Sequence, residues 1–211
     1  MTLAYGPAAG QWQRLHPREA RSLLGQMRLP WWIAGGWALD LYIGRQGRPH
    51  KDLDIGILRR DARAVLLALD GWEFFEARGG ELFGPLTGAP REDVNSLWGR
   101  RIHCSEWVLE LLLEHSEGEQ WVYRRDRRLR RPLDALIRYD PECTPYLAPE
   151  IQLLYKSSHI RPEDDLDFER VRALLDDASR LWLCGALSQL DRQHRWLPAL
   201  RAAGGIASEP G

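Results

Sequence analysis

Apolar residues in the first part of the chain first recur with a helical period and then form a short uninterrupted run. In residues 16–24 they recur three and four positions apart, and Pro30 ends this pattern. The apolar run 31–34 lies between a proline and a glycine and is too short for a helix, so we expect a buried strand there. Residues 37–42 resume the helical pattern and end near Gly44, a residue that favours a helix C-cap.

Residues 52–58 follow a different period, because acidic and aliphatic residues alternate along them. A strand places successive side chains on opposite faces, so Asp52 and Asp54 share one face and the aliphatic residues share the other. We therefore expect a strand with a buried face on one side and a chemically active face on the other.

The rest of the chain divides at residues 141–145, a proline-containing segment that we interpret as a linker. Before it, the leucine-rich run 107–113 is compatible with helix or strand, and its short length between likely turns favours a strand. The other elements expected before the linker are a loose arm over 1–13, a helix over 60–69, strands over 72–77, 101–103 and 121–123, and a Gly/Pro-rich loop over 79–90. Those expected after it are helices over 149–156, 163–175, 179–190 and 196–200. This division predicts two domains, 1–142 and a helical 143–211.

Composition narrows the range of partners. The chain has 211 residues, of which 44% are hydrophobic and 28% charged, as in a globular protein of one large or two small domains. Its formal net charge of -1 gives no overall basic field, so we expect small ligands and no long nucleic acid. No apolar run approaches the roughly 20 residues of a membrane-spanning helix, and no signal segment is recognisable, so we expect a cytoplasmic protein without a membrane partner. The three cysteines lie far apart without a CxxC pair, which argues against a disulfide framework.

Gly35 and Gly36 stand where the first strand gives way to a helix. Glycine permits a tight turn and a close approach of the backbone, and the N–H groups of such a turn can bind phosphates. Asp52 and Asp54 follow on the next strand, where two like charges on one face repel each other unless a cation or a proton lies between them. We interpret this pair as ligands of one or two Mg²⁺ ions that bridge nucleotide phosphates, and the alternative is an exposed acidic edge.

Glu110 is an acidic residue inside the apolar run 107–113. If that run is a strand, an unpaired carboxylate buried there is costly. A shared metal would compensate this cost, as would an arginine or exposure on an edge strand. In the metal-site interpretation, Glu110 is the third metal ligand or the general base that takes a proton from the attacking hydroxyl. Glu114 is the rival candidate, at the end of the strand where solvent can accommodate it.

Several segments between about residue 31 and residue 200 carry a combined resemblance. They are Gly35-Gly36-Trp37-Ala38-Leu39-Asp40, Arg48-x-His50-x-Asp52-x-Asp54, Trp107-x-Leu109-Glu110-Leu111, Trp121-Val122-Tyr123-Arg124-Arg125-Asp126, and Ala148-Pro149-Glu150-x-x-Leu153-Leu154-Tyr155-Lys156 followed by Asp164-Asp165-x-Asp167-Phe168. Together they resemble the aminoglycoside nucleotidyltransferase-like (aminoglycoside-2''-adenylyltransferase-like) branch of the polymerase-beta-type nucleotidyltransferase superfamily. The Gly-Gly and Asp-x-Asp segment is the most specific part of the resemblance.

The resemblance implies an α+β fold, in which a small mixed β-sheet flanked by helices precedes a C-terminal helical domain and ATP and the acceptor bind between them. It also implies that Gly35 and Gly36 hold the triphosphate. Asp52 and Asp54 are implied to bind Mg²⁺ in a two-metal site, with Glu110 completing the carboxylate set. The family often has aspartate where this chain has Glu110, which is longer by one methylene, so metal ligation and general-base catalysis both stay open.

Two cationic residues are candidates for nucleotide binding. Arg48 precedes the Asp-x-Asp strand closely enough to reach a phosphate, and His50 could reach one too, although a hydrogen bond to the backbone of the turn is the interpretation that we favour for it. Lys156 lies on the first helix after the linker, where its ammonium could neutralise a phosphate, and a surface lysine is the alternative. The arginine-rich run 124–131 is interpreted as a solvated surface or a set of structural ion pairs, with phosphate or acceptor contact as the alternative.

Asp164, Asp165 and Asp167 gather at the start of a predicted helix. Acidic residues in the first turn are stabilised by the helix dipole, and this structural interpretation is the one that we favour. The alternative is an acceptor-binding patch that recruits a polycation such as an aminoglycoside.

These features predict a Mg²⁺-dependent nucleotidyltransferase, an adenylyltransferase that moves AMP from ATP to a hydroxyl of a small-molecule acceptor with pyrophosphate leaving. An aminoglycoside-like antibiotic is the acceptor that the resemblance suggests, and with it a role in antibiotic resistance. Two alternatives stay open. One is a non-catalytic nucleotide-binding or interaction protein with the same fold, and the other is a protein-adenylating nucleotidyltransferase of a toxin–antitoxin pair.

Overall fold

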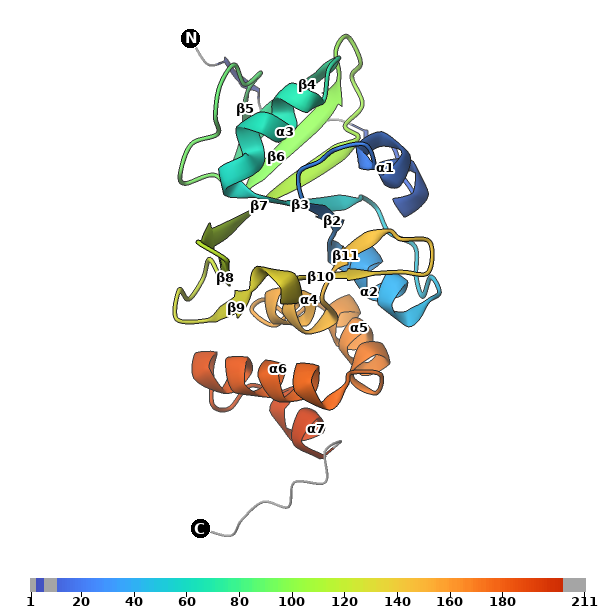
Figure 1. The fold of residues 1–211 in the computed structure, drawn as a ribbon, viewed down its shortest axis with the longest axis vertical. Helices are drawn as coiled ribbons and strands as arrows, with labels where there is room; N and C mark the ends of the chain where they lie inside the picture. Colours follow the sequence, from blue (N-terminus) through green and yellow to red (C-terminus); the bar gives the residue numbers. More distant parts are fainter. Residues whose placement is uncertain (1–2, 6–10, 203–211) are drawn as a thin grey trace.

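The computed structural model describes residues 3–5 and 11–202, and a mixed β-sheet is its central feature (Figure 1). The strands are β1 (Leu3–Tyr5), β2 (Trp31–Ile33), β3 (Asp54–Leu58), β4 (Trp72–Arg78), β5 (Glu81–Gly84), β6 (Ser96–Arg101), β7 (Leu109–Glu117), β8 (Gln120–Val122), β9 (Arg130–Pro132), β10 (Ile137–Tyr139) and β11 (Pro145–Leu147). Their order in the sheet is β1-β5-β4-β6-β7-β3-β2-β11-β10, and β8 and β9 extend the far half of β7. The pairs β3–β7 and β2–β11 are parallel and the others are antiparallel, so the expected mixed sheet is confirmed.

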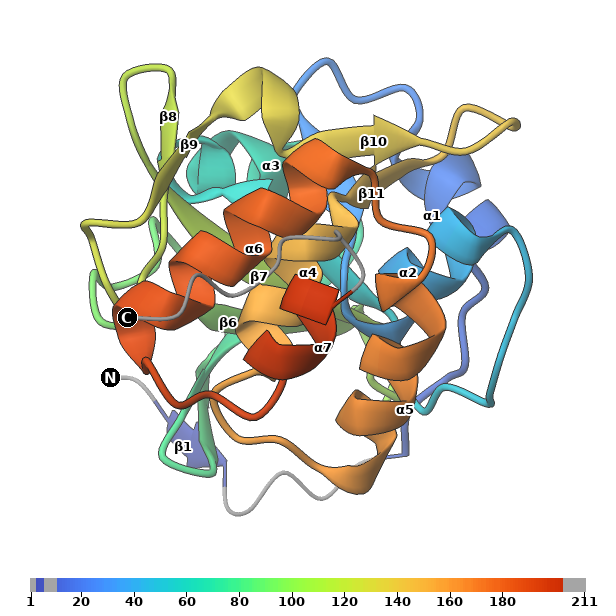
Figure 2. The ribbon, with the colours of Figure 1, turned by 90° about the horizontal axis from the view of Figure 1, so that it is seen from below.

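The helices fall into two groups by their place in the chain, before and after the last strand, and the later group lies at the end of the molecule away from β4 and β5 (Figure 1). Those between the strands are α1 (Pro17–Leu24), α2 (Gly35–Ile43) and α3 (Ala62–Ala68), with short 3-10 turns at Arg59–Asp61 and Leu133–Ala135. Those after the last strand are α4 (Pro149–Lys156), α5 (Pro162–Arg172), α6 (Asp177–Leu190) and α7 (Leu197–Ala202). Seen from below, α6 lies over α4, which in turn contacts α2 and α5 (Figure 2). The expected α+β architecture, with helices gathered after the sheet, is therefore confirmed.

Each of the four central strands has one apolar face, and this alternation sets how the sheet packs. Ile55, Leu97 and Leu111 are paired across neighbouring strands, and all three are completely buried in the main hydrophobic core. On the same face, Phe74 of β4 lies in that core with Val65 of α3. Because successive side chains of a strand point to opposite faces, the register that buries these residues also fixes which residues lie on the other face. That second face carries the candidate chemistry.

Of the strands with three or four residues, β2 and β8 were predicted from the sequence, whereas β1, β5, β9, β10 and β11 were not. The loop expected over 79–90 contains β5, and the strand expected over 101–103 is β6, which ends at Arg101. The arm expected over 1–13 includes β1, which pairs with β5, and the linker over 141–145 joins the two strands β10 and β11. Three or four residues carry too little periodicity to indicate a strand, and these strands are defined by partners far away in the sequence.

The two-domain division at residue 142 remains a prediction. Strand β11 lies beyond that boundary and pairs in parallel with β2, so the sheet continues to Leu147. Two other expectations concern the chain as a whole. All three cysteines are free, as expected, and among residues 11–202 no helix combines the length and hydrophobicity that a bilayer crossing requires.

We expect the Gly56→Ala substitution to destabilise the fold by about 2–3 kcal/mol, because overpacking a core forces side chains out of position. Gly56 lies opposite Trp32 on β2, and a Cβ atom added there would lie 2.0 Å from the Trp32 Nε1 atom. Urea unfolding followed by circular dichroism measures the change.

Gly185→Ala is the matched control, because Gly185 is an exposed residue of α6 and its added Cβ would meet no atom within 4 Å. This change should stabilise the protein by up to about 1 kcal/mol, the helix-propensity gain of alanine over glycine. Equal effects of the two substitutions would contradict the packing that we describe.

Candidate active site

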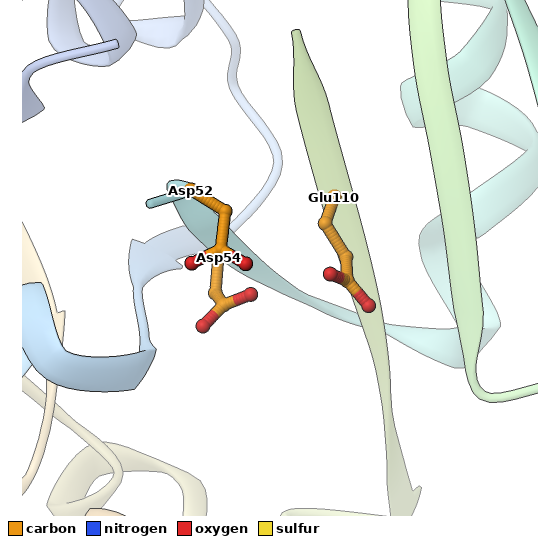
Figure 3. Close-up of side chains that lie close together, drawn as sticks. All are labelled: Asp52, Asp54 and Glu110. Carbon is orange, nitrogen blue, oxygen red and sulfur yellow. The ribbon is translucent and has the colours of Figure 1, made fainter. Parts of the chain in front are cut away.

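Three carboxylates meet where strand β3 begins beside β7. Asp54 is the first residue of β3 and pairs in register with Glu110 of the neighbouring parallel strand, while Asp52 precedes β3 by two residues. One carboxylate oxygen from each of the three side chains lies within 4.8 Å of the other two. Figure 3 shows the three carboxyl groups on the same side of the two strands. The structure therefore brings together the three residues that the sequence analysis selected as metal ligands.

The electrostatics of this cluster suit a divalent cation. Burial, together with the charges of Glu110 and Asp52, raises the pKa of Asp54 to about 8. Burial and the charge of Asp52 also raise the pKa of Glu110, although hydrogen bonds from Ser96 and Trp98 oppose this effect. Like charges this close raise one another's pKa, and a cation between them relieves the repulsion. Oxygen ligands of this kind are those that Mg²⁺ prefers, so the donor set fits that ion.

The two glycines form the first turn of α2 and touch the acidic strand. Gly35 has a φ angle of +65°, and a Cβ atom added to it would lie 2.0 Å from the Asp54 Oδ2 atom. A Cβ atom on Gly36 would lie 2.4 Å from the His50 ring and 2.7 Å from the Arg48 guanidinium. Only glycine therefore allows this turn to approach both segments. The first turn of a helix presents N–H groups without intrahelical partners, which favours an anion there.

A cavity of about 390 Å³ opens over these groups. Its charged and polar lining comes from the loop before β3, from the arginine-rich run after β8, and from α4 and α5 with the segment between them. The cationic residues are Arg48, Lys51, Arg125, Lys156 and Arg161, and the carboxylates are Asp52, Asp54, Glu163 and Asp164. The cavity therefore joins a set of positive charges to the acidic cluster, an arrangement that suits a polyphosphate carrying a divalent cation.

Lys156 and Arg48 line this cavity but are held by carboxylates of α5. The Lys156 ammonium lies 2.6 Å from Asp164 and 3.1 Å from Asp167, and the residue is only 9% exposed, so it is not the surface lysine of the alternative interpretation. Arg48 donates to Asp167 at 3.1 Å. Asp165 instead bonds with Arg195 and with the Trp196 indole on the far side of the helix. All three aspartates have partners within the chain, which favours their structural interpretation, and their role in acceptor binding stays a prediction.

His50 lines the cavity, but its side chain bonds a carboxylate instead of the turn backbone that we expected. Its Nε2 atom lies 2.6 Å from Asp40 of α2, both side chains are buried, and Arg170 of α5 donates to the other oxygen of the same aspartate at 2.9 Å. Burial alone would raise the pKa of Asp40, but its hydrogen bonds with His50, the Gly47 backbone and Arg170 keep that pKa below its usual value. The loop that carries Arg48 and Asp52 is therefore anchored to α2 through the buried hydrogen bond between His50 and Asp40.

Glu114 is not accommodated by solvent, as the sequence analysis expected. It is only 5% exposed and accepts hydrogen bonds from the Tyr155 hydroxyl at 2.5 Å and the Trp121 indole at 2.7 Å. Its pKa is raised by burial, which these two donors oppose. The strand continues past it to Glu117 and pairs with β8, which is why solvent does not reach it. Glu114 thus ties β7 to α4.

The sequence analysis missed several residues of the site. Gln152 of α4 accepts the Gly35 N–H at 2.8 Å, and Ser96 of β6 donates to Glu110 at 2.6 Å. Gln152 lies four residues before Lys156, and this spacing could have indicated that both side chains face the same cavity. Arg125 also lines the cavity, whereas the later arginines of the same run pair with acidic residues, which are Glu117, Asp126 and Glu150.

Comparison of the sequence with known proteins finds a family model and several relatives that match this chain. A family model described as aminoglycoside-2''-adenylyltransferase matches residues 18–77, which include both glycines and Asp52 and Asp54 but end before Glu110. A 2''-aminoglycoside nucleotidyltransferase of Escherichia coli is 28% identical over 108 residues, covering 39% of this chain and 61% of that protein. A lincosamide resistance protein of Staphylococcus haemolyticus is 33% identical over 48 residues, covering 23% of this chain and 30% of that protein. The chain thus spans about three-fifths of the length of the first relative. The resemblance to the aminoglycoside nucleotidyltransferase-like branch is confirmed.

Two solved structures share the fold. The lincosamide antibiotic adenylyltransferase LnuA, bound to lincomycin, superposes with a TM-score of 0.52 at 16% identity, covering 75% of this chain and 95% of that one. The structure of ANT(2")-Ia with adenylyl-2"-tobramycin gives a TM-score of 0.51 at 15% identity, covering 82% and 95%. These likenesses show that the chain has the nucleotidyltransferase fold.

We expect Asp164→Asn to lower stability most at neutral pH. Although burial raises the pKa of Asp164, its hydrogen bonds with Arg161 and Lys156 lower that pKa to about 2. A lowered pKa contributes stability that is present above the ordinary value near 4 and is lost as the pH falls toward 2. The variant should therefore lose on the order of 1–2 kcal/mol at pH 7 after solvent screening is allowed for, and progressively less between about pH 4 and pH 2.

Urea unfolding at pH 7, 4 and 3 measures this difference. Asp134→Asn, at an exposed aspartate, is the control and should change stability little at any of these pH values. A loss at Asp164 that stays constant with pH would contradict the ion pairing that we assign.

Proposed function

We propose that this chain is a Mg²⁺-dependent nucleotidyltransferase that moves AMP from ATP to a hydroxyl of a small-molecule acceptor. One observation carries the proposal, which is that Asp52, Asp54 and Glu110 converge beside a glycine turn and a cavity lined by cationic residues. Each part has a task in phosphoryl-group chemistry, where catalysis consists of positioning and charge stabilisation. A carboxylate cluster that served only the fold would have no reason to border such a cavity.

The triphosphate of ATP is proposed to bind in the 390 Å³ cavity lined by Arg48, Lys51, Arg125, Lys156 and Arg161, which we call the basic cavity. The first turn of α2 offers backbone N–H groups at Gly36 and beyond, while Gln152 holds the Gly35 N–H and so fixes the shape of the turn. Arg125, which follows β8, and Arg161, which precedes α5, both line this cavity. Both side chains are exposed enough to bind phosphate oxygens. Lys156 and Arg48 contribute from ion pairs with α5, which limit how far they can move.

Asp52 and Asp54 would hold the Mg²⁺ ions, with Glu110 near enough to complete the set. When bound, the ions neutralise charge on the phosphates and so lower the barrier to attack at phosphorus. Glu110 is also proposed to accept the proton of the acceptor hydroxyl. Burial raises its pKa above the ordinary value, which strengthens it as a base, and the Ser96 hydroxyl orients it by bonding one of its oxygens.

The relatives suggest an antibiotic as the acceptor. Their names give two chemical classes, the aminoglycosides and the lincosamides, and both classes offer hydroxyl groups to an adenylyltransferase. We therefore propose that the acceptor is an antibiotic-like small molecule and that its modification is the biological role.

Two substitutions separate the proposed roles of the carboxylates. Asp52→Asn should abolish Mg²⁺-dependent binding of ATP, because it removes a negative ligand from the set. Glu110→Gln keeps the size of the side chain but cannot take a proton, so it should lower the rate of pyrophosphate release by a factor on the order of 10²–10⁴ while ATP binding is retained. Isothermal titration with ATP and Mg²⁺ and a coupled pyrophosphate assay measure the two effects.

Asp70→Asn, at an exposed aspartate outside the cavity, is the control for both and should leave binding and rate unchanged. Loss of ATP binding in Glu110→Gln would assign Glu110 to metal ligation rather than proton transfer. Unchanged activity in Asp52→Asn, or no binding of ATP to the native protein in the presence of Mg²⁺, would overturn the proposed function.

A further inference from the structure

The face of the sheet that carries the carboxylates continues beyond them into an aromatic surface. Asp54 pairs with Glu110, Glu110 pairs with Trp98 of β6, and Trp98 pairs with Phe75 of β4. Directly opposed residues of neighbouring strands point to the same face, so these four form one row across the sheet. The row begins at the acidic cluster and ends among tryptophans.

A second cavity, of about 280 Å³, lies along this row. Its walls are the hairpin of β4 and β5 on one side and β6 and β7 on the other. Its lining consists of Ala77, Arg78, Gly79, Gly80, Glu81, Leu82, Ser96, Trp98 and Glu110. Asp52 and Asp54 line the basic cavity, whereas Glu110 and its hydrogen-bond partner Ser96 line this one. Different members of the acidic cluster therefore border cavities of different chemistry, and Asp54 also lines a smaller one beside Glu114 and Tyr155.

The base of the second cavity is apolar and rigid. Trp98 is half-buried, and its ring lies 5.7 Å from that of Trp107 and 4.8 Å from that of Trp12, in edge-to-face contacts. Leu82 and Phe75 are buried in the same small hydrophobic cluster. A half-buried tryptophan packed against two other rings presents an apolar surface of restricted mobility, on which a ligand loses little conformational freedom.

The charges of the second cavity do not favour a polycation. Among the described residues that line it, Arg78 and Glu81 lie directly opposite each other on the hairpin, and Glu110 is the remaining ionisable group. Because side chains alternate along a strand, Arg78 and Glu81 point to the face opposite Trp98, where Arg78 lies near Glu76 and over the ring of Phe83. A ligand with several ammonium groups needs an excess of carboxylates, and on the Trp98 face Glu110 is the one ionisable group among the described residues that line this cavity.

We propose that this second cavity is the acceptor site and that it takes a hydroxyl compound with an apolar ring face and at most one positive charge, in preference to a polycation. The inference rests on the proposed function, because it needs a donor nucleotide on the other side of the acidic cluster. The acceptor lies on the Trp98 ring with a hydroxyl at Glu110. As the hydroxyl oxygen bonds to the α-phosphorus of ATP, its proton passes to Glu110 and the bond from that phosphorus to pyrophosphate breaks.

The test measures acceptor affinity directly, in the full chain loaded with Mg²⁺ and α,β-methylene-ATP, which cannot react. The probes are lincomycin, which has a single basic amine and an apolar end, and tobramycin, which carries several amino groups. Isothermal titration should give a dissociation constant at least about tenfold lower for lincomycin than for tobramycin, a difference equal to about 1.4 kcal/mol.

Three variants test the placement of the acceptor. Trp98→Ala should raise the dissociation constant of lincomycin about tenfold, because it removes the ring surface. Trp98→Phe keeps an aromatic face but loses the indole N–H that bonds Glu110, so it should retain acceptor affinity within about threefold and lower the rate of pyrophosphate release instead. Trp72→Ala, in the same strand as Phe75 but on the opposite face, should leave the affinity unchanged.

The possible results separate this inference from the proposed function, because binding of the nucleotide is titrated first. If the nucleotide binds and tobramycin binds more tightly than lincomycin, or neither binds, the inference is overturned and the donor half of the site stands. An unchanged affinity in Trp98→Ala, with the circular dichroism spectrum retained, would overturn the placement of the acceptor. Failure of the nucleotide itself to bind overturns the proposed function and the inference with it.

Discussion

The parallel pairing of β3 with β7 is the constraint on which the rest of the site depends. It sets Asp54 beside Glu110 in the sheet, where two carboxylates that are partly withdrawn from water repel each other. A fold tolerates such a pair only if the strands around it are held firmly. Here the opposite face of both strands lies in the main hydrophobic core, with Ile55 and Leu111 completely buried. The hydrophobic face stabilises the register that the acidic face opposes.

The charged residues around this pair fall into two groups, one buried and paired and the other exposed. Asp40, Asp164 and Asp167 are buried and accept hydrogen bonds from arginines and from Lys156, and Asp40 is also hydrogen-bonded to His50. This network links α2, the loop before β3, α4 and α5. The charges of its members neutralise one another, so the main effect of this network is to hold the linked segments in position. Residues with charge to spare, such as Lys51, Asp52 and Arg125, are exposed and line the basic cavity. Burial thus separates the residues that hold the site in place from those that meet a ligand.

Periodicity and local motifs predicted the parts of the site that depend on neighbours in sequence. The strand–glycine–helix order at Gly35 is local and was predicted correctly. Asp52 and Asp54 lie close together as expected, but β3 begins at Asp54, so Asp52 precedes the strand that the alternation predicted over 52–58. Glu110 was found because a charge in an apolar strand needs a compensating partner. The partners of His50 and Glu114 were missed, since they come from α2 and α4, which no local pattern relates to those residues. For the same reason the cavity beside Trp98 could not be predicted, because its walls are brought together by the pairing of β4, β5 and β6.

The attachment of α4 at two points has a mechanical consequence. Gln152 of this helix bonds the Gly35 turn, and Tyr155 bonds Glu114 on the strand that also carries Glu110. The helix therefore braces the glycine turn against the acidic strand, and a motion that opened the basic cavity would have to pull on both. Such braced walls behave as one rigid body. The β4–β5 hairpin pairs with β6 on one side and with β1 on the other, and it turns at two exposed glycines, Gly79 and Gly80. Adjustment to ligands of different size therefore falls to this turn beside the acceptor cavity.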